Sequence, residues 1–132
     1  NVRICSPKGF EPKQKIIEKA NSLAQFGSKI TVYNDPLEAV KGVHVIYTDV
    51  WASMGQEDEQ LKRKKIFEKY VVSEKLIKLA DEKVILLHCL PAHRGEEITE
   101  GAFESEFSCI FDQAENRLHV QQALLAVQLG GL

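Results

Sequence analysis

The sequence predicts an α/β fold, a parallel sheet with helices on both faces that together make three layers. Short apolar runs typical of strands alternate along the whole chain with segments whose apolar residues recur at helical spacing. The chain has 132 residues, of which 44% are hydrophobic, enough for one domain with its own core. Because strands joined by helices run parallel through right-handed crossovers, their carboxyl ends are expected at one edge of the sheet.

The predicted elements follow one another through short connections. Strands are expected at residues 2–5, 30–33, 43–48, 84–88 and 108–111. Helices are expected at residues 13–26, 35–42, 73–80 and 112–129, with a charged helix after Gly55 that buries Ile66, Phe67, Tyr70 and Val71. Gly27 predicts the end of the first helix, while Asp35 and Asp112 predict N-caps, each with a Glu three residues later. The unbroken apolar run 84–87 is typical of a strand buried on both faces.

Composition excludes several classes of protein. The net charge of −2 and the even mixture of acidic and basic residues argue against a nucleic-acid or membrane-surface partner. No apolar run approaches the roughly 20 residues that cross a bilayer, and no signal peptide is expected. Cys5, Cys89 and Cys109 are an odd number without metal-ligand spacing, which favours a reducing, cytoplasmic location over a disulfide scaffold.

Two polar segments follow strand ends and are expected to share one edge of the sheet. Residues 49–55 follow one strand, and residues 88–91 end another. Asp49 can pair with an ammonium group of a ligand, and Cys89 adds a thiol beside it. Gly55 allows a loop to fold over that ligand. A cis Leu90–Pro91 bond would turn the Leu90 carbonyl into the site as a fixed acceptor.

Each of these residues also fits a purely structural role. Cys89 fits a small buried apolar residue, and Asp49 fits a helix cap. His88 fits a hydrogen-bonded core histidine better than a metal ligand, because no second His or Cys lies at ligand spacing. Trp51 and Met54 fit packing, and Arg117 fits a surface charge. A Cys-His protease and a dinucleotide site are excluded, because their sequence signatures are missing.

The two segments together resemble those of a known enzyme family. Residues 49–55, Asp-Val-Trp-Ala-Ser-Met-Gly, resemble the ornithine-binding loop of ornithine carbamoyltransferases, and residues 88–91 resemble that family's His-Cys-Leu-Pro motif. Residues 115–117, Glu-Asn-Arg, resemble a third signature, and residues 6–12 and 34–36 are also similar. The resemblance covers essentially the whole chain in the right order. It implies a Rossmann-like domain of α/β class, the carboxy-terminal ornithine-binding domain of such an enzyme.

The resemblance also implies an activity and roles for residues. Family members transfer the carbamoyl group of carbamoyl phosphate to the δ-amine of L-ornithine, giving citrulline and phosphate without a metal or organic cofactor. Asp49 and Cys89 are implied as catalytic residues, and Asp49, Ser53 and Met54 as ligands of ornithine. For carbamoyl phosphate the resemblance implies Cys89, Leu90 and Arg117, and as supporting residues it implies His88 and Pro91.

One departure from the family pattern limits this expectation. Family members have a second, amino-terminal domain with a Ser-Thr-Arg-Thr-Arg phosphate loop, and this sequence contains no such loop. Residues 1–132 are therefore expected to form an ornithine-binding domain without its first strand–helix unit, inactive alone, from a homotrimeric enzyme of arginine metabolism. Two alternatives stay open: a carbamoyltransferase for another amine such as putrescine, and a non-catalytic amino-acid-binding or regulatory module. The Ser-Met-Gly sequence of residues 53–55 favours ornithine.

Overall fold

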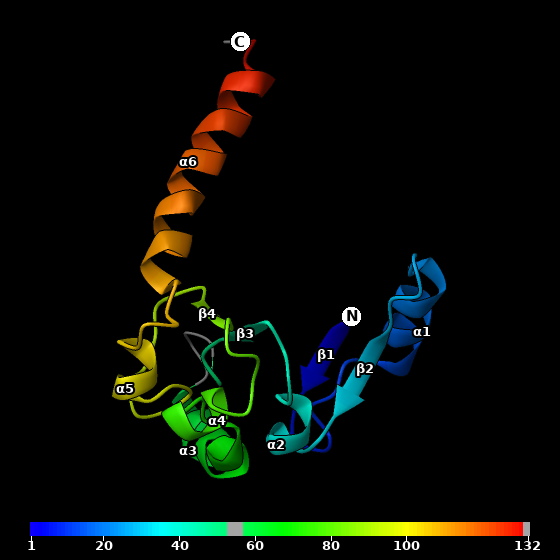
Figure 1. The fold of residues 1–132 in the computed structure, drawn as a ribbon, viewed down its shortest axis with the longest axis vertical. Coiled ribbons are helices and arrows are strands. Elements are labelled where there is room, and N and C mark those ends of the chain that lie inside the picture. Colours follow the sequence, from blue (N-terminus) through cyan, green and yellow to red (C-terminus); the bar gives the residue numbers. More distant parts are fainter. Residues whose placement is uncertain (53–56, 131–132) are drawn as a thin grey trace.

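The computed structural model describes residues 1–52 and 57–130, in which helices separate the successive strands (Figure 1). The strands are β1 (Val2–Cys5), β2 (Ile30–Tyr33), β3 (Val45–Thr48) and β4 (Ile85–His88). The helices are α1 (Gln14–Leu23), α2 (Pro36–Ala39), α3 (Glu57–Phe67), α4 (Glu74–Ile77), α5 (Glu100–Phe103) and α6 (Ile110–Gln128), with a 3-10 turn at Glu68–Tyr70. The predicted α/β class is confirmed.

The described strands form two parallel pairs where the sequence predicts one sheet. β1 pairs with β2 and β3 pairs with β4, both parallel. In the second pair Thr48 lies opposite His88, so the residues that follow β3 and β4 emerge side by side. Figure 1 shows the two pairs apart from each other, with α2 on the segment that links them. The predicted shared edge is therefore formed by β3 and β4.

The hydrophobic core lies around the second pair of strands. It joins β3 and β4 to α4, α5 and the start of α6, and includes Ile46, Leu86, Ile98, Phe103 and Ile110. Burial along β4 alternates: Leu86 and His88 are buried, whereas Ile85 is 38% exposed. The prediction that this strand is buried on both faces is wrong, because the side of Ile85 and Leu87 is only partly covered.

Helix starts follow the sequence signals better than helix ends do. The side chain of Asp35 accepts a hydrogen bond from the Leu37 amide at 2.9 Å, and Pro36 takes the first helical position, as predicted. Ser73 caps α4 in the same way. The expected end of α1 is wrong: the helix stops at Leu23, and Gly27 lies beyond it in a turn with a φ of 73°.

The predicted strand at 108–111 is wrong. Only Ser108 forms a parallel bridge, to Leu86, and α6 begins at Ile110. The Leu86 amide donates to the Phe107 carbonyl, and the Leu86 carbonyl accepts the Cys109 amide, so this segment is held against β4. The fully buried Ile110 then packs the start of α6 into the core. Asp112 consequently lies in the first turn of α6 and is not its N-cap; its charge there suits the helix dipole.

The long helix α6 leaves most of its apolar side chains uncovered. Figure 1 shows it projecting away from the other elements. Its side chains that are more than half exposed include Leu118, Val120, Leu124, Leu125 and Val127. Among the described residues, none of the helices combines the length and apolar character needed to cross a membrane.

Candidate functional site

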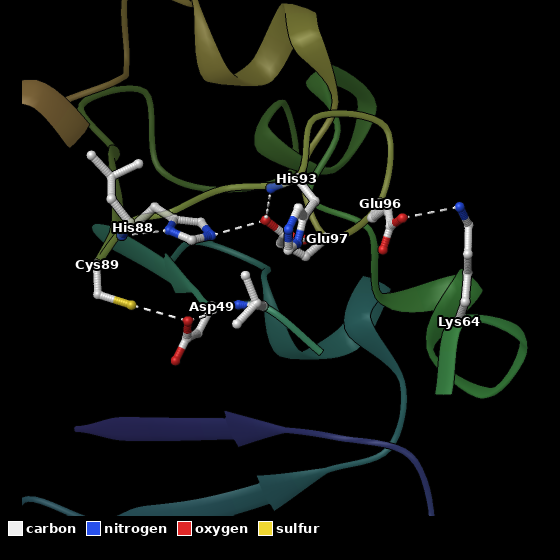
Figure 2. Close-up of polar contacts among 9 residues, drawn as sticks. Asp49, Lys64, His88, Cys89, His93, Glu96 and Glu97 are labelled. Atoms are coloured by element: carbon white, nitrogen blue, oxygen red, sulfur yellow. Dashed lines mark hydrogen bonds and ion pairs between the residues drawn. The ribbon is translucent and has the colours of Figure 1, made fainter. Parts of the chain in front are cut away.

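Asp49 and Cys89 meet where β3 and β4 end (Figure 2). Each follows the last residue of its strand, and the parallel register places these last residues opposite each other. The Cys89 thiol donates a hydrogen bond to Asp49 Oδ1 over 3.0 Å, and the same oxygen accepts the Val50 amide at 2.7 Å. Asp49 is exposed and Cys89 is half-buried, so a carboxylate and a thiol lie together within reach of a ligand.

The environment keeps the Cys89 thiol protonated. Burial, then the hydrogen bond to Asp49, then the negative charge of Asp49 raise the pKa of Cys89 above its ordinary value. Hydrogen bonds with Tyr47 and with its own backbone act in the opposite direction and are smaller. A thiol with a raised pKa is a poor nucleophile near neutral pH, so Cys89 is suited to hydrogen bonding and not to covalent catalysis.

The coupling of these two residues predicts a change in thiol reactivity. In Asp49→Asn the negative charge that raises the pKa of Cys89 is removed and its hydrogen bond is reduced to one with a neutral amide, while burial remains, so the pKa falls and more thiolate forms at a given pH. We expect Cys89 to react with iodoacetamide severalfold faster at pH 8 in this variant, as followed by peptide mass spectrometry. Cys5 is the internal control, since burial and Asp35 raise its pKa to about 11 independently of Asp49. An unchanged Cys89 rate would contradict the coupling.

The turn after Cys89 has an unusual backbone. The Leu90–Pro91 bond is cis, and Leu90 has a φ of 55°. The Leu90 amide donates to His88 Nδ1 at 2.9 Å, and Arg117 Nη1 donates to the Cys89 carbonyl at 3.2 Å. Two side chains therefore hold the backbone of residues 89–90 in place. Arg117, from α6, therefore lies next to Cys89, and the role in binding carbamoyl phosphate that the resemblance implies for it stays a prediction.

His88 is held by a buried glutamate, Glu97, which the sequence motifs do not single out. His88 Nε2 lies 3.1 Å from Glu97 Oε1, and both side chains are almost completely buried (Figure 2). Nδ1 accepts a hydrogen bond from the Leu90 amide, so the ring proton is on Nε2. Nε2 therefore donates a hydrogen bond to Glu97. The same Glu97 oxygen accepts the His93 amide at 2.6 Å. His88 is thus a hydrogen-bonded core histidine that supports the turn.

Gln113 is a second residue that sequence reasoning missed. Its Oε1 accepts the His88 amide at 3.0 Å, and its Nε2 donates to the Tyr47 hydroxyl at 3.2 Å. It therefore ties α6 to both strands of the site. A polar residue on the first turn of a helix carries no sequence signal for such a role, whereas the adjacent pair Glu96–Glu97 could have been found as acids close to a His-containing motif.

The loop after Asp49 begins against an aromatic cluster. Arg63 donates to the Trp51 carbonyl at 3.1 Å, and the Trp51 ring lies 5.8 Å from that of Phe67. The first residues of the loop are thereby packed on the end of α3, in line with a packing role for Trp51. The predicted ligand-binding residues Ser53 and Met54 lie outside the described residues.

Two groups of side chains bring potential metal ligands within 4.8 Å of one another among the described residues. They are Asp49, His88 and Cys89, and His93, Glu96 and Glu97. In the first group both His88 ring nitrogens already take part in hydrogen bonds within the protein, which leaves His88 no free donor for a metal. In the second group, Glu96 pairs with Lys64 and Glu97 with His88. The side chains of both groups are therefore better explained by hydrogen bonds and ion pairs within the protein than by a bound metal ion.

The α/β fold and the site at the ends of β3 and β4 are those of a known class of enzyme domain, which comparison with protein families identifies. Residues 1–128 match the model of the aspartate/ornithine carbamoyltransferase Asp/Orn binding domain. The chain belongs to this family.

Named relatives agree with that assignment. The chain is 64% identical over 132 residues to an ornithine carbamoyltransferase of Prochlorococcus marinus, covering all of this chain and 42% of the relative. The ornithine carbamoyltransferase structure from Pyrococcus furiosus matches all of this chain and 42% of its own, with 48% identity and a TM-score of 0.89. An N-acetyl-L-ornithine transcarbamylase complexed with PALAO matches 96% of this chain and 40% of its own, with 27% identity and a TM-score of 0.78. The chain thus spans less than half of these relatives.

Proposed function

We propose that this chain is the ornithine-binding part of an ornithine carbamoyltransferase that converts carbamoyl phosphate and L-ornithine to citrulline and phosphate. The observation that carries the proposal is the Asp49–Cys89 pair at adjacent strand ends, with Arg117 on the Cys89 carbonyl. It occurs in a chain 64% identical to a named ornithine carbamoyltransferase. Because the chain spans 42% of that relative, we propose that catalysis requires the rest of the polypeptide, including the phosphate-binding domain.

In the proposed reaction the δ-amine of ornithine attacks the carbonyl carbon of carbamoyl phosphate. The δ-amine arrives as an ammonium ion and must lose a proton, with the Asp49 carboxylate as the nearby acceptor, before it can attack. The exposed Asp49 carboxylate pairs with the amino groups of ornithine, and Cys89 lies beside the reacting δ-amine. The tetrahedral intermediate then collapses, the bond from carbon to the phosphate oxygen breaks, and phosphate leaves. Ordering two substrates side by side supplies a large share of the rate.

The remaining roles concern carbamoyl phosphate and the closing loop. Arg117, held next to Cys89, contacts carbamoyl phosphate and stabilises the negative charge that develops on it, while the Leu90 carbonyl accepts a hydrogen bond from the amino group of the carbamoyl moiety. His88 and Pro91 support the turn that presents them. Ser53 and Met54 belong to the loop that closes over ornithine and excludes water.

The parent protein and its setting follow from the same proposal. We expect the chain to be the carboxy-terminal domain of its parent, without its first strand–helix unit, and a Ser-Thr-Arg-Thr-Arg loop to be encoded upstream. The parent is expected to be a cytoplasmic homotrimer of arginine metabolism. The three free cysteines agree with a reducing compartment. Sequencing the coding region upstream of Asn1 tests the order of the domains, and an open reading frame without that loop would contradict it.

The assay that tests the function compares the chain alone with the completed protein. We expect no citrulline from the 132-residue chain with ornithine and carbamoyl phosphate, because the phosphate-binding half is missing, and turnover when that half is present. Ornithine, putrescine and N-acetyl-L-ornithine are offered in parallel, with ornithine expected to give the highest kcat/KM. Citrulline formed by the isolated chain, or a preference for another amine, would contradict the proposal. Binding of ornithine without any turnover by the completed protein would favour a regulatory module.

A further inference from the structure

A network of hydrogen bonds leads from the backbone of His88 to the carboxylate of Asp49. It includes two side chains outside the sequence motifs, Tyr47 on β3 and Gln113 on α6. Gln113 Oε1 accepts the His88 amide at 3.0 Å, and Gln113 Nε2 donates to the Tyr47 hydroxyl at 3.2 Å. The Tyr47 hydroxyl also makes a hydrogen bond with the Cys89 thiol, which in turn donates to Asp49 over 3.0 Å. Four side chains are therefore connected in one network.

The direction of each hydrogen bond in this network follows from its first donor. A backbone amide can only donate, so the Gln113 atom that faces His88 is the oxygen, and the nitrogen faces Tyr47. A side-chain amide nitrogen can only donate as well, so the Tyr47 oxygen accepts and keeps its own proton for another acceptor. That acceptor is Cys89 Sγ. An ionised carboxylate only accepts, so the thiol proton points to Asp49.

The strand register places the Tyr47 side chain beside this pair. Tyr47 lies opposite Leu87, and Asp49 and Cys89 each come two residues further along the chain. Side chains two residues apart on a strand lie on the same face, so Tyr47 approaches Asp49 and Cys89 from the strand side. The side chain of Tyr47 is 56% exposed, so its hydroxyl lies at the surface of the site and not in the core.

The network also settles which oxygen of Asp49 is left for a ligand. Both hydrogen bonds that Asp49 accepts from the described residues, from the Cys89 thiol and from the Val50 amide, fall on Oδ1. Figure 2 shows the second oxygen turned away from the thiol. An ammonium group has three donors and no acceptor, so a free carboxylate oxygen is the group that it needs.

We propose that Tyr47 and Gln113 are positioning residues of this site, which fix the Cys89 thiol as a donor to Asp49 Oδ1 and so present Oδ2 to the amine of ornithine. The inference rests on the proposed function and adds two residues to it. With its sulfur accepting from Tyr47 and its proton on Asp49, the thiol holds the carboxylate in one orientation before the substrate arrives. Such preorganisation contributes to the rate because the substrate does not have to order the groups itself.

Thiol alkylation tests the network without any need for enzyme activity. The hydrogen bond from Tyr47 lowers the pKa of Cys89, so Tyr47→Phe raises that pKa and less thiolate forms. We expect iodoacetamide to modify Cys89 about twofold more slowly at pH 8 in the 132-residue chain, the opposite of the change in Asp49→Asn. Tyr33→Phe, which removes a hydroxyl on β2, is the matched control and should leave the rate unchanged. An unchanged or faster rate in Tyr47→Phe would overturn the proposal.

Gln113→Glu tests the direction of the hydrogen bonds. A carboxylate accepts at both oxygens, so Glu at this position would still accept the His88 amide but would take the Tyr47 proton, and Tyr47 could no longer donate to Cys89. We expect alkylation to slow by about twofold or more, and by a smaller factor in a Tyr47→Phe background, where only the added charge acts. Gln121→Glu adds the same charge further along α6 and should leave the rate unchanged. A wild-type rate in Gln113→Glu would overturn the assigned direction and the proposal with it.

Kinetics of the completed enzyme test the effect on the reaction. Tyr47→Phe is expected to lower kcat/KM for ornithine by about three- to tenfold and to leave the KM for carbamoyl phosphate unchanged, because the carboxylate is less firmly oriented. In an Asp49→Asn background the same substitution should cost less than about twofold, since the carboxylate that it orients is absent. A purely structural role of the Tyr47 hydroxyl would lower the activity equally in both backgrounds, and that result would overturn the proposal.

The same experiments separate this inference from the proposed function. A completed wild-type enzyme that does not transfer the carbamoyl group to ornithine contradicts the proposed function, and the role in presenting Asp49 to ornithine fails with it. An active enzyme in which Tyr47→Phe changes neither the alkylation of Cys89 nor the kinetics with ornithine contradicts this inference alone.

Discussion

Asp49→Asn in the completed enzyme is expected to lower kcat/KM for ornithine by about 10²–10⁴-fold. The substitution keeps the size of the side chain and removes the charge that pairs with the amine and helps take its proton. Among the described residues, Asp49 is the carboxylate that accepts the hydrogen bond of the Cys89 thiol, over 3.0 Å. Steady-state kinetics with each substrate varied in turn would measure the effect.

The pattern of the kinetic constants distinguishes this role from a general loss of structure. We expect the KM for ornithine to rise and kcat to fall, while the KM for carbamoyl phosphate changes little. Asp81→Asn is the matched control: Asp81 precedes β4, at the opposite end of the strand from the site, and contacts His44. An Asp49→Asn enzyme with normal ornithine kinetics would remove Asp49 from the proposed mechanism.

Glu97→Ala is expected to destabilise the chain by about 3 kcal/mol, because it removes the acceptor of two hydrogen bonds. The buried His88 ring nitrogen and the His93 amide both depend on the same Glu97 oxygen. Without it, one fully buried donor is left unpaired and the turn that presents Cys89 loses its anchor. Unfolding in urea, followed by circular dichroism, would measure the free energy of unfolding of the variant and the wild-type chain.

The neighbouring glutamate provides the control for this prediction. Glu96 is partly exposed and pairs with Lys64 at 3.2 Å, so Glu96→Ala should cost less than about 1 kcal/mol. Glu97→Gln keeps an acceptor for both donors and should lie between the two alanine variants. Equal effects of the two alanine substitutions would show that burial of the Glu97 contact contributes little.

Local sequence signals predicted much of this fold because they act through nearest neighbours. Asp35 and Pro36 start α2 through a side-chain cap and a fixed φ, both local effects. The same kind of signal misplaced the start of α6, where the buried side chain of Ile110 outweighs the capping pattern at Asp112. Helix ends and short strands depend on what packs against them, and residues 108–111 lack a partner strand for more than one bridge.

The sequence by itself determined the α/β class, the two strand ends that carry polar residues, and the placement of both at one edge of the sheet. Strand order and crossover handedness suffice for that inference. Only the tertiary structure decided that Glu97 and Gln113 hold His88, since a buried contact between residues 9 or 25 positions apart has no periodicity to reveal it. Only the tertiary structure, likewise, divided the expected sheet into two strand pairs, β1 with β2 and β3 with β4, in the part of the chain that the structure describes. The backbone N–H and C=O groups of a strand point to both of its sides, and each needs a hydrogen-bond partner. Which strands supply those partners depends on the tertiary structure and not on the local sequence.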